Sequence, residues 1–424
     1  MAKQDTSTVV PRLRFPEFRG ANGWRTTPLE RIAERVATKN SGGRVARVLT
    51  NSAEFGVLNQ RDYFDKDIAT AGKVDGYYIV DKGDYVYNPR TSTIAPVGPI
   101  SRNNLGEGVM SPLYTVFRFS ADQTDFYEHY FRSTGWHSYL RSAASTGARH
   151  DRMSITAGAF MRMPMPMPSS AEQQKISACL TSLDEVIAAQ GRKVEALKTH
   201  KRGLMQQLFP REGEARPRLR FPEFRNAPEW EERELGEVAN IFKGKGISKA
   251  DTAVSGVTPC IRYGELYTIY GEVIDQVQSR TSVQSAELVL SEPGDVIIPA
   301  SGETKEDIAT CAVVLDRGVA LGGDLNIVRA DIDGRFFSYY LNGSKRRALA
   351  RVAQGDAVVH LYPRQLEKLK VTIPANKAEQ KRIADCLSVL DTRVAAESRQ
   401  LTALKTHKQG LMQQLFPTPE ATGA

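Results

Sequence analysis

The chain has 424 residues, enough for two or three domains with cores of their own, and Lys and Arg outnumber Asp and Glu by 57 to 49, a surplus that suits a nucleic-acid partner. Its four cysteines form no CxxC pair and have no histidine at zinc spacing, which argues against a structural metal and a disulfide framework. No apolar leader opens the chain and no stretch reaches the ~18 apolar residues of a membrane span, so we expect a soluble cytoplasmic protein without a membrane partner.

The first recognisable element is the nonapeptide PRLRFPEFR at residues 11–19, which returns unchanged at 217–225. In the segments that follow the two copies, Trp24 and Trp230 occupy equivalent positions. Self-similarity at a fixed separation indicates a duplicated frame, so the chain reads as a tandem repeat.

The first insert between the repeated segments covers residues 37–170. Its short apolar runs are broken by Gly, Pro, Asn and Asp, and 125–143 has a helical pattern, which together predict an α+β domain. Its polar loops carry Arg, Asn and Gln, which can pair with base edges, and hydroxyls, which more often contact phosphates. For each such residue the alternative is an ordinary surface group. The predicted DNA-binding residues of this insert are Asn59, Gln60, Arg61, Asn88, Arg90, Ser92, Thr93, Arg149, His150 and Arg152.

A longer repeat joins the two inserts: residues 171–210 match 378–417 at 25 of 40 positions. Apolar residues recur in each copy at alternating spacings of four and three, interrupted in the first copy only by Gln190 and Lys201. This heptad seam predicts a helix of ~35 residues in each copy. Because each helix leaves one insert, the two can pair within the chain only by running antiparallel.

Some identical residues lie outside the heptad seam, and the seam does not require them. They imply either packing of each helix against its insert domain or contact with two copies of one partner protein. The residues chosen as candidates for partner contact are Met205, Phe209, Met412 and Phe416.

The second insert, residues 243–377, has the same α+β character, with helical residues at 336–352. Its loop KGKGISK, 243–249, can place ammonium and backbone N–H groups against phosphates, although a solvated turn is an equal alternative. Two further loops, at 261–272 and 301–307, interleave cations with tyrosines or hydroxyls. The predicted DNA-binding residues here are Lys243, Lys245, Ser248, Lys249, Arg262, Tyr263, Tyr267, Ser301, Thr304 and Lys305.

Three catalytic patterns are incomplete. Asp295 with Glu303-Thr304-Lys305 has the residue types of a nuclease metal site, but the spacing is loose and only one half carries it. YNPR at 87–90 departs from the methyltransferase loop Asn-Pro-Pro-aromatic, because Arg90 replaces the second proline. No GxxxxGK[ST] cradle for ATP is present. We therefore expect a protein with no catalytic residues and no bound metal.

The duplicated motifs AEQQKI…CL..LD, LKTHK.GLMQQLFP and PRLRFPEF, with GDYVYNPRTSTIAPVG and SPLYTVFRF in the first insert, resemble the specificity subunit of type I restriction-modification systems. The resemblance implies an α+β chain with two α/β target recognition domains joined by two long antiparallel coiled-coil helices in a pseudo-twofold tandem repeat. The expected boundaries are 1–170 for the first recognition domain, 171–210 for the first helix, 211–377 for the second domain, 378–417 for the second helix and 418–424 for a tail.

The resemblance also implies the function. Each variable domain would read one half of a bipartite site in double-stranded DNA, while the helices set the spacer and dock two methyltransferase subunits for N6-adenine methylation. Motor-nuclease subunits would join for restriction. S-adenosylmethionine, ATP and Mg²⁺ are expected on those partner subunits, with no cofactor on this chain. The alternative from the residues alone is a coiled-coil DNA-binding regulator that acts without partners.

Overall fold

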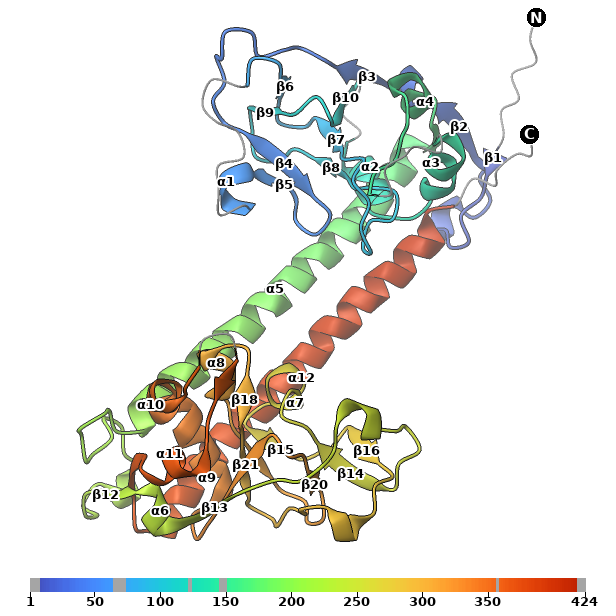
Figure 1. Cartoon of the computed structure of the whole chain (residues 1–424). Coiled ribbons are helices and arrows are strands. Elements are labelled where there is room, and N and C mark those ends of the chain that lie inside the picture. Colours follow the sequence, from blue (N-terminus) through green and yellow to red (C-terminus); the bar gives the residue numbers. More distant parts are fainter. Residues whose placement is uncertain (1–7, 64–73, 121–123, 145–150, 356–357, 418–424) are drawn as a thin grey trace, which may run out of the picture. The chain divides into compact units, whose positions relative to one another are not determined.

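The computed structural model describes residues 8–63, 74–120, 124–144, 151–355 and 358–417. The chain divides into two compact units (Figure 1). Unit 1 comprises residues 1–190 and 400–424, and unit 2 comprises residues 191–399. Each unit therefore contains one insert and the parts of both repeated segments that pack against it.

Unit 1 is built around a four-stranded antiparallel sheet in the order β3-β10-β7-β8. A smaller sheet β1-β2-β11 and the pairs β4-β5 and β6-β9 complete its strands. The strands are β1 (Thr8–Val9), β2 (Trp24–Pro28), β3 (Ala33–Val36), β4 (Leu49–Ser52), β5 (Gly56–Asn59), β6 (Tyr78–Val80), β7 (Tyr85–Tyr87), β8 (Ile100–Arg102), β9 (Gly108–Met110), β10 (Thr115–Phe119) and β11 (Pro164–Met167). The short helices are α1 (Gln60–Tyr63), α2 (Thr124–Phe131), α3 (His137–Ala143) and α4 (Ala157–Met161).

Unit 2 contains a five-stranded sheet in the order β13-β21-β17-β19-β15 and a three-stranded sheet β16-β14-β20, with the pairs β12-β23 and β18-β22. The strands are β12 (Glu231–Glu234), β13 (Ala239–Lys243), β14 (Thr258–Ile261), β15 (Val273–Ile274), β16 (Ser279–Thr281), β17 (Val296–Pro299), β18 (Ser301–Gly302), β19 (Ala312–Val314), β20 (Ala320–Leu321), β21 (Leu325–Ala330), β22 (Val359–His360) and β23 (Lys370–Ile373). The short helices are α6 (Leu235–Val238), α7 (Glu265–Thr268), α8 (Lys305–Ile308), α9 (Gly334–Tyr340), α10 (Arg346–Val352) and α11 (Pro363–Glu367). The mixed α and β content expected from the sequence is confirmed.

The two inserts share a sheet core although their sequences do not align. The order β3-β10-β7-β8 in unit 1 corresponds to β13-β21-β17-β19 in unit 2. In both, a Gly-Asp turn leads into the central strand, and its buried carboxylate pairs with an arginine 34 residues later. Asp84 Oδ1 accepts from Arg118 Nε at 2.6 Å, and Asp295 Oδ1 accepts from Arg329 Nε at 2.8 Å. A buried carboxylate needs such a partner, so this pair explains why the turn recurs.

The longer repeats form two helices of 39 residues each, α5 (Ser170–Leu208) and α12 (Lys377–Leu415), green and red in Figure 1. Every residue of the two heptad seams is buried or half-buried. Within unit 2, Lys201 of α5 pairs with Asp391 of α12, and Lys193 pairs with Glu397. From the first pair to the second, the residue number falls along α5 and rises along α12, so these two segments run antiparallel.

The repeated nonapeptide fastens each unit at its helix ends. In unit 1, Arg14 Nε and Nη2 donate to the two carboxylate oxygens of Glu172 at 2.6 and 2.7 Å, near the start of α5. The neighbouring Leu13 N–H donates to Gln414 O at 3.0 Å, near the end of α12. Unit 2 repeats this arrangement through Arg220 with Glu379 and through Leu219 with Gln207. Both carboxylates are 1% exposed, so the bidentate arginine is what allows them to be buried.

The structure contradicts the prediction that four off-seam residues contact a partner. Their exposed fractions lie between 2% and 7%, and each is part of the core of its own unit. The ring of Phe416 packs against Phe126 and Tyr130 in unit 1, and that of Phe209 packs against Phe336 and Tyr340 in unit 2. The prediction is wrong because their identity between copies reflects packing against the insert domains. The corrected residues are Met205, Phe209, Met412 and Phe416.

Candidate nucleic-acid interface

A hollow of about 480 Å³ in unit 1 brings together five of the predicted DNA-binding residues from separate segments. They come from α1, from the loop after β7 and from the segment before α4. They are Gln60, Asn88, Arg90, Ser92 and Arg152. The predicted residues Arg149 and His150 lie outside the described part of the chain.

The arginines supply the positive charge of this hollow. The side chain of Arg90 is 62% exposed and its Nη2 lies 3.8 Å from Asp151 Oδ2, while the side chain of Arg152 is 30% exposed and its Nε lies 4.0 Å from the same oxygen. Two arginines share one carboxylate at the limit of ion-pair distance, which leaves a net positive charge. Long, exposed contacts of this kind are weak, so both guanidinium groups are free to bind an anion.

Three of the predicted residues of unit 1 hold its loops in place through hydrogen bonds. Asn88 Nδ2 donates to Asn51 O at 2.9 Å, and its Oδ1 accepts from Arg90 N–H at 3.0 Å. Ser92 Oγ accepts from Ala95 N–H, while Asn59 bridges Arg47 and Asp62. Asn88 and Ser92 therefore shape the hollow, whereas Asn59, Arg61 and Thr93 are not among the described residues that line it.

The sequence analysis missed the floor of the hollow. Thr50 and Tyr114 form a hydroxyl pair at 3.0 Å, and Asn51, Ser52 and Ser111 also line it. The signals available were the run of three polar residues in LTNS, all of them buried in β4, and the serine and tyrosine of SPLY just before β10. These hydroxyl and amide groups add donors and acceptors close to the two arginines.

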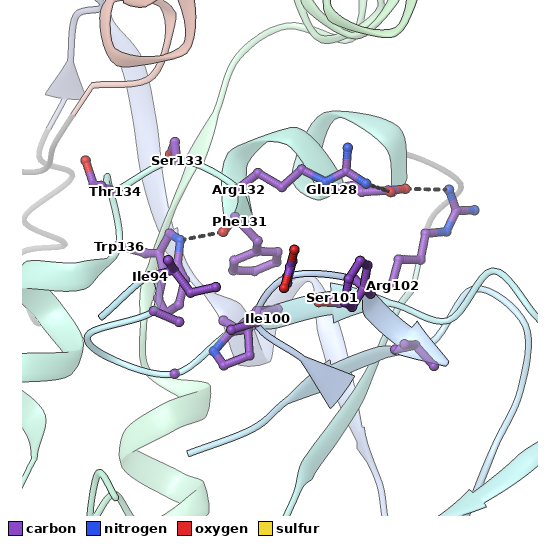
Figure 2. A pocket seen from close by; sticks show the side chains of 18 of the residues that line it. Ile94, Ile100, Ser101, Arg102, Glu128, Phe131, Arg132, Ser133, Thr134 and Trp136 are labelled. Carbon is purple, nitrogen blue, oxygen red and sulfur yellow. Dashed lines mark hydrogen bonds and ion pairs between the residues drawn. The ribbon is translucent and has the colours of Figure 1, made fainter. Parts of the chain in front are cut away.

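A second hollow in unit 1, of about 630 Å³, contains none of the predicted residues. Figure 2 shows Arg132 and Arg102 both directed at Glu128, with N–O distances of 2.7 and 3.7 Å. Its apolar wall includes Phe131, whose carbonyl accepts from Trp136 Nε1 at 3.1 Å (Figure 2). Since its arginines are satisfied by neighbouring carboxylates, this hollow offers less positive charge to DNA than the first.

In unit 2 the loop 243–249 is held in a defined shape. Gly244 N–H donates to Leu325 O, and a Cβ at Gly244 would lie 2.2 Å from Gly322 O, so glycine is required there. The buried Ile247 adopts φ 58°, a left-handed conformation that is strained for a β-branched residue. Its neighbours at the surface are the predicted Lys243, Lys245, Ser248 and Lys249, all exposed.

The serine of this loop has a structural role. Ser248 N–H and Oγ both donate to Asp251 Oδ2 at 2.7 Å, which lowers the pKa of that carboxyl. Lys243 Nζ lies 5.5 Å from the ring centroid of Tyr362. Three lysines with one tightly bound carboxylate form a positive surface suited to phosphates.

Arg262 and the tyrosines Tyr263 and Tyr267 differ in how freely they could bind DNA. Arg262 Nη2 donates to the buried Glu265 at 3.1 Å, so its charge is already paired. Tyr263 and Tyr267 contact edge to face at 6.4 Å, and Tyr267 lines a separate hollow of about 550 Å³.

The remaining predicted residues of unit 2 lie around β18 and α8. Thr304 caps α8 by accepting from Asp307 N–H at 3.1 Å, and Lys305 is exposed. Ser301 pairs with His360 on β22, whose ring stacks 6.0 Å from that of Tyr362. Tyr362 also contacts Lys243 of the loop 243–249, called the lysine loop from here on. The sequence analysis identified neither His360 nor Tyr362.

The nuclease pattern is not assembled in the described residues. Asp295 is 1% exposed and accepts from both Arg329 Nε and Nη2, so it cannot bind a cation at the surface. No group of three or more metal-ligating side chains is found in the described part of the chain. Over the same residues, no helix is both long and apolar enough to cross a membrane.

Comparison with known proteins gives consistent matches. Residues 228–406 match the family model described as the type I restriction modification DNA specificity domain. The chain is 24% identical over 293 residues to the type I restriction enzyme MjaVIII specificity subunit of Methanocaldococcus jannaschii, a match that spans 66% of each protein. It is 27% identical to a Haemophilus influenzae protein named as a type I restriction enzyme specificity subunit, S.HindORF215P, over 86% of this chain and 87% of that one.

Two solved structures share the fold. One comes from work on complex assembly and conformational transition of the type I R-M system, with 17% identity, a TM-score of 0.57 and coverage of 93% of this chain and 98% of the other. The second is the type I restriction-modification S subunit from M. genitalium, with 14% identity, a TM-score of 0.54 and coverage of 96% and 99%. The family match and the two curated relatives confirm the resemblance to type I restriction-modification specificity subunits that the repeated motifs indicated, and the two solved structures show that the fold is shared.

Proposed function

We propose that this chain is the DNA-recognition subunit of a type I restriction-modification complex, in which each recognition domain reads one half of a bipartite site. The observation that carries this proposal is the hollow of unit 1, where Arg90 and Arg152 share a single carboxylate beside amide and hydroxyl groups. Guanidinium groups pair with guanine edges and with phosphates. The lysine loop 243–249 would contribute phosphate contacts in the other domain.

The two long helices would act as the spacer. The proposed arrangement is the antiparallel coiled coil of a pseudo-twofold repeat, supported by the seam burial and by the equivalent contacts of Arg14 with Glu172 and Arg220 with Glu379. At about 1.5 Å per residue, 39 residues span about 58 Å. At about 3.4 Å per base pair that length corresponds to about 17 base pairs, enough to separate two short half-sites. The proposed boundaries of the domains remain those expected from the repeat.

Two copies of a methyltransferase subunit would dock on a repeated stripe of the helices. Six residues of α5 are identical to their counterparts in α12, follow a spacing of three and four, and are exposed apart from a half-buried glycine in each copy. The first stripe is Ala189, Arg192, Ala196, Thr199, Gly203 and Gln206. The second stripe is Ala396, Arg399, Ala403, Thr406, Gly410 and Gln413.

The glycine in each stripe supports the proposal that a partner protein docks there. A Cβ built at Gly203 or Gly410 meets no atom within 4 Å, so nothing in the described residues requires glycine. Glycine inside a helix is nevertheless about 1 kcal/mol less favourable than alanine. Its presence at both equivalent positions is explained if a helix of a partner approaches closely there. In this proposal the chain itself is not catalytic, and S-adenosylmethionine, ATP and Mg²⁺ belong to the methyltransferase and motor-nuclease subunits.

The test is to co-express the chain with candidate methyltransferase subunits, select bound duplexes from a random pool and map methylated adenines. We expect a bipartite motif and co-purification at two methyltransferase subunits per chain. The double variant R90Q/R152Q should then weaken DNA binding at least tenfold and alter one half-site only, whereas R19Q, an exposed arginine of the nonapeptide, should not. Tight specific binding by the chain alone, without retention of a methyltransferase, would favour a regulator acting without partners.

A further inference from the structure

The turn 253–257 of unit 2 presents two valines to solvent. Val254 has a relative exposure of 103% and Val257 of 80%, while no other large apolar side chain in the described residues exceeds 67%. Single exposed apolar residues are common, but two on one five-residue turn, each far more exposed than the rest, form a distinct feature.

This turn is rigidly built. Gly256 N–H donates to Ala253 O at 3.0 Å, and Ala253 N–H donates to Arg280 O at 2.9 Å. The Arg280 side chain returns two hydrogen bonds, from Nε to Gly256 O at 2.7 Å and from Nη2 to Val257 O. The two valines are therefore displayed on a fixed backbone.

Glycine is required at the centre of the turn. A Cβ at Gly256 would lie 2.6 Å from the backbone N of Thr281, so only glycine allows the turn to pack against β16. Thr281 is fully buried, and its hydroxyl donates to Asp251 O at 2.7 Å, which ties β16 to the segment between the lysine loop and the turn. Such preorganisation lowers the entropy lost when the turn binds a partner.

The charges around the turn are mainly positive. Lys249 is exposed four residues before the turn, Lys245 is exposed earlier in the same loop, and Arg280 binds the base of the turn, while Asp251 is the one acidic residue in the described segment between this loop and the turn. Apolar side chains framed by cations match the DNA major groove, where thymine alone displays a methyl group and phosphates flank the bases. A protein partner would more often meet an apolar patch with a polar rim of both signs.

We propose that Val254 and Val257 contact thymine C5-methyl groups and so read at least one A·T pair of the half-site recognised by unit 2. This inference rests on the proposed function and adds specificity-determining residues that supply apolar contacts. The cations nearby would hold the phosphates on either side. Val254 is the more protruding of the two side chains and would make the main contact.

The experiment uses the full chain with its methyltransferase partner and the duplex obtained by selection. Each thymine of the selected site is replaced in turn by deoxyuridine, which removes only the methyl group. Wild-type affinity should fall about fourfold at one or two positions, the effect of one methyl group losing its apolar contact. The variants V254A and V257A should bind the thymine duplex more weakly and lose this discrimination. V10A, at a valine 65% exposed in unit 1, should bind as the wild type does.

The outcomes separate the two proposals. If selection yields no enriched site with the wild-type complex, both the proposed function and this inference fail. If a site is found but V254A and V257A keep the full response to deoxyuridine, only the inference fails. Loss of the methyltransferase subunit in V254A, with unchanged DNA affinity of the remaining complex, would also overturn it and identify a protein contact. Because both valine side chains are fully or largely exposed, all variants should have the thermal stability of the wild type. A measured stability equal to that of the wild type excludes misfolding as the cause of weaker binding.

Discussion

Lys201 donates a 2.5 Å hydrogen bond to Asp391, a residue 190 positions later in the chain, at one of the polar interruptions of the heptad seam. Asp391 also accepts from Tyr339 Oη at 2.5 Å. Burial raises the pKa of Asp391, and the Lys201 ammonium opposes that rise. Unit 1 contains the equivalent pair, Lys408 with Asp184, also at 2.5 Å. The lysine that interrupts each seam is therefore paired with an aspartate of the other helix.

We expect K201M to destabilise unit 2 by about 2 kcal/mol, because it leaves a partly buried carboxylate without its cation. The double variant K201M/D391M should recover part of that loss, since it removes both charges together. Urea denaturation of the wild type, K201M and K201M/D391M measures the loss of unfolding free energy and its partial recovery. K198M is the matched control, because Lys198 pairs with Glu195 on the surface and should contribute less than about 0.5 kcal/mol. Equal effects of K201M and K198M would show that the seam pair has no special role.

The two equivalent tryptophans provide a second comparison. Trp230 Nε1 donates to Glu379 Oε1 at 3.3 Å, whereas Trp24 Nε1 is buried and has no hydrogen-bond partner among the described residues. Replacement by phenylalanine removes a similar volume at both sites but a hydrogen bond at only one. We therefore expect W230F to cost about 1 kcal/mol more than W24F. Thermal unfolding of the two variants decides this, and a larger loss in W24F would contradict the prediction.

The repeated frame could be predicted from the sequence because its signals are local. Heptad spacing and the stop at Pro210 are enough to identify a long helix, and the exact nonapeptide repeat shows where the two frames begin. The shared sheet order of the inserts could not be predicted because their sequences do not align, even in the buried central strands β7 and β17. A clue was nevertheless present, since the aspartate of each Gly-Asp turn is followed after 34 residues by an arginine, Arg118 or Arg329.

The candidate site was less predictable. Loop composition identified Arg90 and Arg152, which lie together, but it could not separate them from Asn88 and Arg262, which have internal partners. Identity between copies was also ambiguous, because a core residue and a partner-contacting residue are preserved for the same apolar character. Phe209 was misassigned for this reason, although the alignment of Trp24 with Trp230 already indicated a shared aromatic core.

Substitution of Gly203 and Gly410 tests whether the repeated stripe binds a partner or only packs within the chain. G203A and G410A should each stabilise the isolated chain by up to about 1 kcal/mol, because alanine favours the helix and a Cβ meets no neighbour. The same variants should weaken binding of a methyltransferase subunit about tenfold if a partner helix packs at these positions. Denaturation of the chain and titration with the partner measure the two effects separately. G191A is the control, since Gly191 also has space for a Cβ but is not repeated at Ser398. Stabilisation with unchanged partner affinity would remove the stripe from the docking surface.

We expect His129 to make the stability of unit 1 sensitive to acid. Burial lowers the pKa of His129 to about 4, with smaller contributions from Lys408 and Arg132, while Asp184 and Asp125 act in the opposite direction. The unfolded chain binds a proton on this histidine near pH 6.5, so between about pH 6.5 and 4 it takes up more protons than the folded chain. The stability of unit 1 should therefore fall as the pH is lowered through this window, by up to about 3 kcal/mol from this residue.

Tyrosine is a suitable replacement for His129. In unit 2, Tyr339 donates to Asp391, and in unit 1 His129 lies beside Asp184, the equivalent of Asp391. H129Y should flatten the dependence of unfolding free energy on pH between 6.5 and 4. Some dependence should remain, because burial also lowers the pKa of His137 to about 4. H200Q, at an exposed position of α5, should leave the profile unchanged. Denaturation midpoints at several pH values measure these slopes, and a wild-type slope in H129Y would exclude His129 as the source of acid sensitivity.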